Sequence, residues 1–147
     1  MAAEKTFRFT LLTPTRKLAE QDVVNVIFRA ETGDVGILAG HEPIITTLGY
    51  GSVRVFDKEG TETVFTAFGG FAEMDDNNNL RIMSDKAERA DEIDVERAKS
   101  AAERSRRAQA EKTDALAIRK AELAFRRAQV RLEVSSYPII QGKHDDL

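Results

Sequence analysis

The spacing of hydrophobic and polar residues divides the chain into a first part that predicts strands and a second part that predicts helices. Up to residue 85, short runs of β-branched and aromatic residues are separated by turn-forming residues, which is typical of strands. The expected strands are Phe7–Leu12, Asp22–Ala30, Val35–Leu38, Gly51–Phe56, Glu62–Phe68, Gly70–Met74 and Leu80–Met83. Their regular spacing, without helical patterns between them, favours antiparallel neighbours in a sandwich or flattened barrel.

Two polar turns support antiparallel pairing. The segment from Asp57 to Gly60 lies between two apolar runs and ends in glycine, as a hairpin loop commonly does. The segment from Asp75 to Asn79 has the same character and predicts a second turn.

From Asp91 onward the apolar residues recur with the period of a helix. Asp91 or Asp94 is expected to cap the first helix, because a carboxylate at that position accepts hydrogen bonds from free N–H groups. One face of this helix consists of small residues, namely Ala98, Ala101, Ala102, Ser105 and Ala108. A second helix approaches such a face closely but gains little apolar burial, so we expect a contact that reverses easily.

A second helix is expected from about Asp114 to Val134, which completes a helical hairpin. One of its apolar stripes consists of Ile118, Ala121, Phe125, Ala128 and Leu132. Another lies on nearly the opposite side and consists of Leu116, Leu123 and Val130. Either both stripes are permanently buried in one compact fold, or the second meets the sandwich, a partner subunit, or each in turn.

The patterns predict three segments: a β-sandwich at residues 1–86, a helical hairpin at 87–134 and a mobile tail at 135–147, which contains Pro138 and Gly142. Charge changes at the same boundary. Residues 1–85 hold 8 Lys/Arg and 13 Asp/Glu, a net charge of −5, and residues 86–147 hold 14 and 12, a net charge of +2. The two halves are therefore expected to have different roles.

Composition excludes several classes of protein. A chain of 147 residues that is 41% hydrophobic and 32% charged is long enough for a core and too apolar for wholesale disorder. It has no cysteine, which removes disulfides and thiolate zinc sites. No apolar signal region follows the first residues, and no run approaches ~18 apolar residues, so we expect neither export nor a membrane span.

Catalytic motifs are also missing. The sequence has no G-x-x-x-x-G-K-[ST] loop, and no lysine follows Gly69–Gly70 at a spacing that suits phosphates, so a nucleotide hydrolase is not expected. His41 and His144 do not have the spacing of a metal site, and we assign no metal ligands. A hydrolytic cluster of Asp34, His41 and Glu42 is the weaker interpretation, because a histidine in a glycine-rich bend is more commonly a contact residue.

The most informative segment is G-D-V-G-I-L-A-G-H-E-P, from Gly33 to Pro43. Its glycines predict two tight bends around a short strand, and hence a rigid surface corner. Together with Phe68–Phe71 and the helix start Ile93–Ala98, this segment resembles the epsilon subunit of bacterial F-type ATP synthases, and the resemblance extends over nearly the whole chain. The fold class that it implies is an N-terminal antiparallel β-sandwich followed by a C-terminal two-helix hairpin.

The resemblance also implies a non-catalytic coupling and regulatory role. The sandwich would attach to the gamma subunit, and the corner would face the c-ring through Gly33, Asp34, Gly36, Gly40 and His41. The folded hairpin would permit ATP hydrolysis, whereas the extended hairpin would reach the catalytic alpha and beta subunits and obstruct rotation. The implied location is the cytoplasmic face of the bacterial inner membrane, with membrane contact only through the c-ring.

Arginines are concentrated on both predicted helices, and their spacing alone leaves two interpretations. They could converge on phosphate oxygens, or they could form a solvated surface with pairs such as Glu122 and Arg126. The family's [I/L]-D-x-x-R-A helix start, which is intact here, implies a regulatory ATP site, and no cofactor is expected to be required. The resemblance implies nucleotide contacts at Glu88, Ile93, Asp94, Arg97, Ala98, Arg104, Arg127 and Arg131. A vestigial site that no longer binds ATP tightly stays open.

Two other classes of function stay open at this stage. A generic adaptor or chaperone-like binding module would show the same division into strands and a coiled hairpin. A nucleic-acid binder would use the arginines, but the 12 acidic residues among residues 86–147 intersperse the basic charge, and we therefore assign no nucleic-acid partner.

Overall fold

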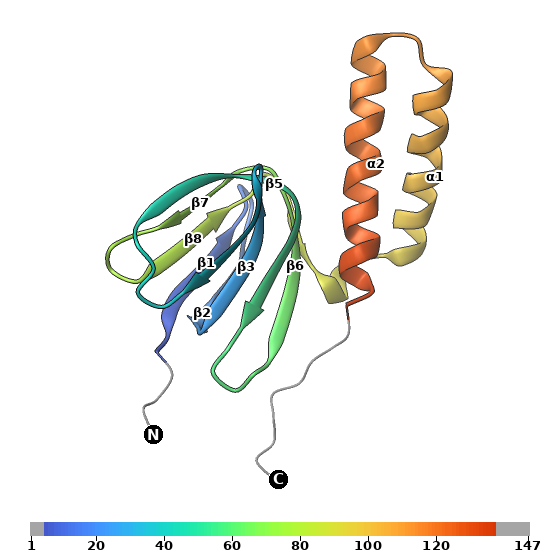
Figure 1. Ribbon diagram of the computed structural model, residues 1–147. Coiled ribbons are helices and arrows are strands. Elements are labelled where there is room, and N and C mark those ends of the chain that lie inside the picture. The colour runs from blue at the N-terminus through green and yellow to red at the C-terminus, as the bar shows by residue number, and fades with distance from the viewer. Residues whose placement is uncertain (1–4, 138–147) are drawn as a thin grey trace.

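The computed structural model describes residues 5–137, which form a β-sandwich followed by a two-helix hairpin (Figure 1). The strands are β1 (Phe7–Leu12), β2 (Lys17–Val23), β3 (Asn25–Ala30), β4 (Gly33–Leu38), β5 (Ile44–Phe56), β6 (Glu62–Phe68), β7 (Phe71–Met74), β8 (Asn79–Met83) and β9 (Ala87–Arg89). A 3₁₀ turn, η1 (Ala90–Glu92), leads to the helices α1 (Val95–Glu111) and α2 (Ala115–Ser135). The predicted fold class is confirmed, and the tail predicted at 135–147 lies outside the described residues from 138 onward.

Two sheets share the long strand β5. Sheet A has the order β2-β1-β8-β7-β5, and sheet B has the order β4-β3-β5-β6-β9. The first residues of β5 pair with β7 up to Thr47, and its later residues pair with β3 and β6. At Gly51 an added Cβ would lie 2.5 Å from Cβ of Arg29, so the close approach of β3 requires glycine there.

The pairing differs from the prediction in two respects. β1 pairs with β8 in parallel, from Arg8 opposite Asn79 to Leu12 opposite Met83, whereas only antiparallel neighbours were expected. The predicted strand Asp22–Ala30 is two strands, since β2 ends at Val23 and β3 begins at Asn25. The chain changes sheets at this point, because β2 pairs with β1 in sheet A and β3 pairs with β4 and β5 in sheet B.

The boundary between the two parts lies later than residue 86. β9 pairs with β6, with Ala87 opposite Ala67 and Arg89 opposite Phe65, so residues 87–89 belong to sheet B rather than to the hairpin. The prediction failed here because a strand of three residues, Ala-Glu-Arg, has no alternating pattern that distinguishes it from a helix start.

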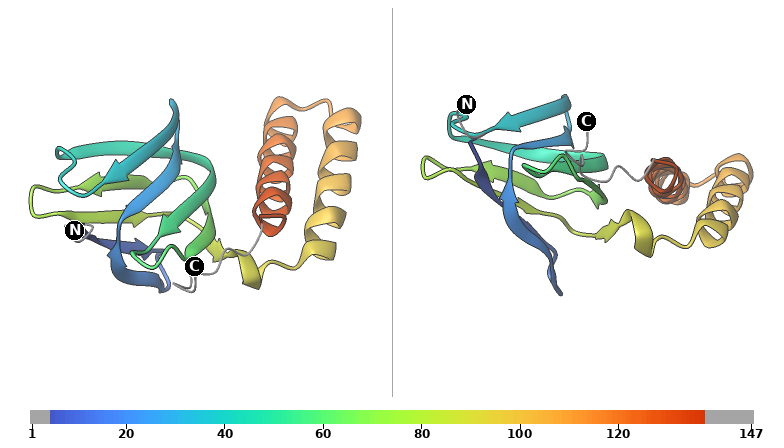
Figure 2. Two further views of the ribbon diagram at one scale, coloured as in Figure 1. Left: turned by 60° about the horizontal axis from the view of Figure 1, so that its bottom comes forward. Right: turned by 90° about the horizontal axis from the view of Figure 1, so that it is seen from below.

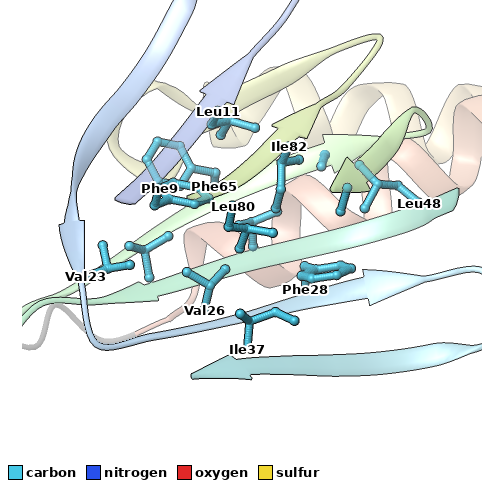
Figure 3. Packing of buried hydrophobic residues seen from close by; sticks show 14 of the residues in the cluster. Phe9, Leu11, Val23, Val26, Phe28, Ile37, Leu48, Phe65, Leu80 and Ile82 are labelled. Carbon is cyan, nitrogen blue, oxygen red and sulfur yellow. The ribbon is translucent and has the colours of Figure 1, made fainter. Parts of the chain in front are cut away.

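The core lies between the two sheets (Figure 3). Phe9 and Leu11 from β1 and Ile82 from β8 are fully buried and meet Phe28 and Val26 of the opposite sheet. These residues alternate with exposed or half-buried ones along each strand, as the period of a half-buried strand requires. The predicted alternation and the core are therefore confirmed for these strands.

The hairpin follows the predicted capping. The Asp94 carboxylate accepts a hydrogen bond from the Arg97 amide at 3.1 Å, and Asp114 caps α2 through the Ala117 amide at 3.0 Å. Ala98 and Ser105 of α1 are buried, so the small face packs on α2. Figures 1 and 2 show α2 between the sandwich and α1. Neither helix in residues 5–137 is long and apolar enough to cross a membrane.

Candidate functional site

An apolar cluster joins the end of α2 to sheet B. Val130 and Val134 of α2 are buried against Val64 and Phe68 of β6, and Ile93 completes the cluster. Leu116, at the far end of the same helix, is 63% exposed. The stripe that contains Val130 therefore meets the sandwich only at its last turns, and the alternative in which both stripes of α2 are permanently buried is wrong for Leu116.

Three contacts between arginines and aromatic rings surround this cluster. The guanidinium carbon of Arg131 lies 5.0 Å from the centre of the Phe68 ring, and that of Arg126 lies 5.4 Å from the centre of the Tyr50 ring. In the third contact the arginine belongs to the sheet and the ring follows α2: the guanidinium carbon of Arg54 lies 5.2 Å from the centre of the Tyr137 ring. Such contacts contribute about 0.5–2 kcal/mol each, depending on desolvation. They fasten the last turns of α2 to the outer face of sheet B.

The strongest polar contact at this junction is the pair Glu88–Arg131. Nε of Arg131 donates to a carboxylate oxygen of Glu88 at 2.6 Å, and the two side chains are 27% and 30% exposed. Glu88 belongs to β9 and Arg131 to α2, so the pair links the sandwich directly to the hairpin. Both residues were among the predicted nucleotide contacts, and the structure brings these two together.

The other predicted nucleotide residues fall into two groups. Ile93 and Ala98 are buried in packing, and the Asp94 carboxylate is engaged as the helix cap. Arg97 and Arg104 are exposed on α1, and Arg127 is half-buried on α2. Within residues 5–137, these three guanidinium groups form no ion pair, and the antiparallel hairpin places the start of α1 beside the end of α2. The hairpin thus carries three arginines that have no ion-pair partner among residues 5–137.

Other arginines are engaged within the helices. Arg106 and Arg107 both bond to Glu103, at 2.8 and 3.0 Å, and the hydrogen bonds, first from Arg106, lower the pKa of the Glu103 carboxyl. Glu122 pairs with Arg119 at 3.3 Å. The expected pair of Glu122 with Arg126 is absent among the described residues, because Arg126 lies over the Tyr50 ring instead. These pairs follow the solvated-surface interpretation for Arg106, Arg107 and Arg119.

A cavity of about 240 Å³ opens beside the junction, on the outer face of sheet B. Its lining residues are Ile27, Arg29, Asp34, Tyr50, Gly51, Ser52, Arg54, Glu133 and Tyr137. The charges in this lining are balanced, since Arg29 pairs with Asp34 at 2.8 Å and Arg54 pairs with Glu62 at 2.9 Å. The cavity therefore presents no unpaired cluster of one sign, and sequence reasoning had not located it.

Three of the five residues predicted to face a partner ring lie in β4, and Gly40 and His41 follow its end. Gly33 has φ 136° and starts the strand, and Gly40 has φ 81° and follows its end. Gly36 lies within the strand opposite Ile27, and positive φ is not found there. The six extended residues of this edge strand span about 20 Å, with Asp34 near its start and His41 past its end. The two predicted bends are confirmed, and the strand between them begins at Gly33 rather than at the predicted Val35.

The outer face of sheet A carries an apolar row that sequence reasoning missed. Thr47, Phe71, Met83 and Leu12 lie directly opposite one another on the adjacent strands β5, β7, β8 and β1. Phe71 and Met83 are each 42% exposed, and Ile45 on the same face is 71% exposed. The apolar residues at outward positions of Gly70–Met74 and Leu80–Met83 were the available signal. A contiguous exposed apolar patch of this kind commonly marks a protein interface.

Among residues 5–137, no group of three or more histidine, aspartate or glutamate side chains is arranged to hold a metal ion. The junction instead combines an apolar cluster, contacts between arginines and aromatic rings, and the ion pair Glu88–Arg131.

Comparison with known families identifies both parts of the chain. Residues 6–90 match the family model described as the ATP synthase delta/epsilon chain, beta-sandwich domain. Residues 91–136 match the model of the long alpha-helix domain of the same chain. The boundary between the two matches, after residue 90, falls within η1 and one residue past the end of β9.

Individual relatives extend this similarity over most of the chain. The ATP synthase epsilon chain of Bacillus pumilus is 39% identical over 131 residues, which cover 89% of this chain and 98% of the relative. That of Caldanaerobacter subterraneus is 35% identical over 133 residues, covering 90% and 96%. A chain in the cryo-EM structure of Euglena gracilis mitochondrial ATP synthase, OSCP/F1/c-ring, has a TM-score of 0.80 and 26% identity and covers 90% of this chain and 82% of its own length.

Proposed function

The chain belongs to the ATP synthase delta/epsilon family, among the epsilon chains of F-type enzymes, and from this premise we propose that it couples the catalytic head to the membrane rotor and regulates ATP hydrolysis. Epsilon chains are non-catalytic subunits of the stalk. This membership displaces the generic adaptor and nucleic-acid interpretations. The proposed location is peripheral, on the cytoplasmic face of the bacterial inner membrane, by analogy with the bacterial relatives.

The observation that carries this proposal is the division of the sandwich into two outer faces with different uses. The hairpin docks on sheet B, whereas the apolar row of sheet A stays exposed. We assign the row around Phe71 and Met83 to the gamma subunit, because burying it in a partner removes apolar surface from water. The sandwich would then stay attached whether or not the hairpin moves.

The edge strand β4 is assigned to the c-ring. Gly33, Asp34, Gly36, Gly40 and His41 would meet the ring along the length of this strand, since they are not gathered at one point. The relatives of known structure occur in assemblies named for a c-ring, which supports this assignment.

The hairpin is assigned to regulation. Its docked form, described above, would permit ATP hydrolysis, and its extended form would reach the alpha and beta subunits and obstruct rotation. Docking rests on two buried valines and a few partly exposed polar contacts, so it contributes only a few kcal/mol and is readily reversed. The exposed Leu116 leaves part of the second stripe available for the extended form.

ATP would stabilise the docked form by binding around Arg97, Arg104 and Arg127, next to the Glu88–Arg131 pair. A ligand that binds only one of two states stabilises that state, by about 2.7 kcal/mol when the ligand is at 100 times its dissociation constant. Arg97→Ala is expected to weaken ATP binding by about one to two decades, because it removes a charge-assisted phosphate contact. Calorimetry on both chains tests this, and equal affinities would show that the motif serves only as a helix start.

Binding to gamma is tested separately with two matched substitutions. Phe71→Asp places a charge in the apolar row of sheet A, and Leu38→Asp places one at a site on sheet B that is 60% exposed. We expect Phe71→Asp to weaken binding to purified gamma by at least tenfold and Leu38→Asp to leave it unchanged. If both variants bind gamma as the unaltered chain does, sheet A is not the gamma surface.

A further inference from the structure

One asparagine ties together three segments at the end of the sandwich away from the hairpin, where Figure 1 shows the turn between β7 and β8. The side-chain oxygen of Asn78 accepts a hydrogen bond from the Gly40 amide at 2.9 Å. Its side-chain nitrogen donates to the Thr6 carbonyl at 3.2 Å. Its backbone carbonyl accepts from the Arg8 amide at 3.0 Å. A single residue thus joins the β7–β8 turn, the β4–β5 loop and the start of β1.

The geometry of Asn78 leaves little freedom in how this junction forms. Its φ is +65°, and it is the one residue other than glycine with positive φ in residues 5–137. Asparagine tolerates this conformation better than most residues, although glycine adopts it more easily. Reversing the amide would place an NH₂ group against the Gly40 N–H and an oxygen against the Thr6 carbonyl, so only one orientation satisfies both partners.

The bend next to Gly40 has a further hydrogen bond of its own. The His41 amide donates to the Leu38 carbonyl at 3.1 Å and closes the turn, in which Gly40 has φ +81°. This bond fixes the shape of the turn but not its position relative to the rest of the sandwich. The Asn78 side chain supplies that second restraint, through a residue 38 positions away in the sequence.

We propose that Asn78 is a positioning residue for the Gly40–His41 bend, and that it holds this end of β4 in place for contact with a partner. The contact with the c-ring rests on the proposed function, whereas the positioning itself rests only on the three hydrogen bonds. Asn78 also lies where the parallel pairing of β1 with β8 begins, since Arg8 is opposite Asn79. Asn78 therefore connects the bend to β1, a strand that is paired on both edges, with β2 and with β8.

The test compares three substitutions in the full chain. Asn78→Gly permits the positive φ but removes both side-chain hydrogen bonds, so it is expected to fold. Asn78→Asp keeps the acceptor for Gly40 and loses the donor to Thr6. Asn77→Gly is the control, because Asn77 is exposed in the same turn and its side chain makes no hydrogen bond within residues 5–137.

The first measurement is amide hydrogen exchange at Gly40, with the chemical shifts of His41, by NMR. Loss of one hydrogen bond is expected to accelerate exchange at Gly40 about five- to tenfold in Asn78→Gly, with His41 shifts that Asn77→Gly does not show. Asn78→Asp is expected to keep the protection of Gly40. The positioning role is overturned if the Gly40 amide exchanges in Asn78→Gly as slowly as in the unaltered chain. It is also overturned if the Gly40 amide loses its protection in Asn78→Asp.

The second measurement is ATP-driven proton pumping per ATP hydrolysed in the reconstituted enzyme. Asn78→Gly is expected to lower this ratio and Asn77→Gly to preserve it. If Gly40 is released in Asn78→Gly and the pumping ratio is unchanged, Asn78 still positions the bend, and it is the proposed contact with the c-ring that fails.

Discussion

The pair Glu88–Arg131 gives the sharpest prediction, because it links the sandwich to the movable part. Arg131→Met keeps an unbranched apolar side chain in place of the arginine stem and removes the bond to Glu88 and the guanidinium contact with the Phe68 ring. A hydrogen bond between charged groups contributes about 1.5–3 kcal/mol when buried, and the partial exposure of both side chains reduces this to about 1–1.5. The contact with the ring adds about 0.5–1 kcal/mol.

The sum of about 2 kcal/mol corresponds to a change of about 30-fold in the ratio of docked to undocked hairpin. A hairpin that is undocked in about 1% of molecules would then be undocked in about 23%. The chain has no cysteine, so a variant in which cysteines replace both Lys58 and Lys112 carries spin labels at these two positions only. The first lies in the β5–β6 turn and the second in the helix connection, and both are exposed. Their distance distribution therefore reports docking directly.

The matched control for this measurement is Arg119→Met, which lies on the same helix and removes only an intrahelical pair with Glu122. Exposed pairs of that kind contribute about 0.3–0.5 kcal/mol, so the control is expected to leave the distance distribution nearly unchanged. Glu88→Gln is expected to reproduce part of the effect of Arg131→Met. If Arg131→Met and Arg119→Met give the same undocked fraction, the pair does not hold the hairpin, and the reasoning is refuted.

Three further predictions concern the sandwich. Gly70→Ala is expected to destabilise the fold by about 3 kcal/mol or more, because the new Cβ would lie 1.9 Å from the Met83 carbonyl oxygen on a backbone with φ +104°. Gly36→Ala, whose Cβ would have no atom within 4 Å, is expected to change stability by less than about 0.5 kcal/mol, and similar melting temperatures for the two variants would contradict this difference. A fragment of residues 1–90 is expected to fold and to melt at a higher temperature than one of residues 1–86, because β9 covers the edge of β6, and identical melting curves would show that β9 adds nothing. Hydrogen bonds, first from the Asn79 amide, lower the pKa of Asp75 from its ordinary value of 3.8, so the ionised carboxylate contributes its full stability above that pH and loses it as the pH falls through the lower pKa of the folded state. The stability advantage of the unaltered chain over Asp75→Asn is therefore expected to shrink below about pH 4, and an advantage that does not change with pH would contradict this linkage.

Local patterns predicted much of the fold. β1 and β6 were predicted to the residue, and α2 begins and ends within one residue of the expected range. Asp94 was one of two expected caps, and its carboxylate does accept the Arg97 amide. These elements were predictable because alternation, helical period and capping are properties of neighbouring residues.

The elements that the sequence did not predict depend on contacts between distant residues. β5 begins at Ile44 and continues through Gly51, where the predicted strand began, because Arg29 on the neighbouring strand occupies the space that a side chain at Gly51 would need. The parallel pairing of β1 with β8 has no local signal, since the two strands lie about 70 residues apart.

The candidate site was predictable only in part. Glu88 and Arg131 were identified by resemblance, and spacing alone could not show that a strand of three residues would place Glu88 against α2. The contact of Arg126 with Tyr50 replaced an expected pair on the helix surface, because the docked sheet offers a ring within reach. Tertiary packing thus decided which of many arginines are engaged.

The parallel pairing of β1 with β8 also determines the order in which the chain folds. β1 finds β2 after a short turn, but its other neighbour is synthesised only after about 65 more residues, and closing so long a loop slows folding. The hairpin, in contrast, joins two helices across a short connection, so it is expected to form faster than the long-range strand pair. On the ribosome, however, β8 emerges before either helix, so the slow step begins first. The nascent sandwich is therefore expected to be closed by the time α2 arrives to dock on it, and a nascent chain that ends before residue 79 is expected to leave one edge of β1 unpaired.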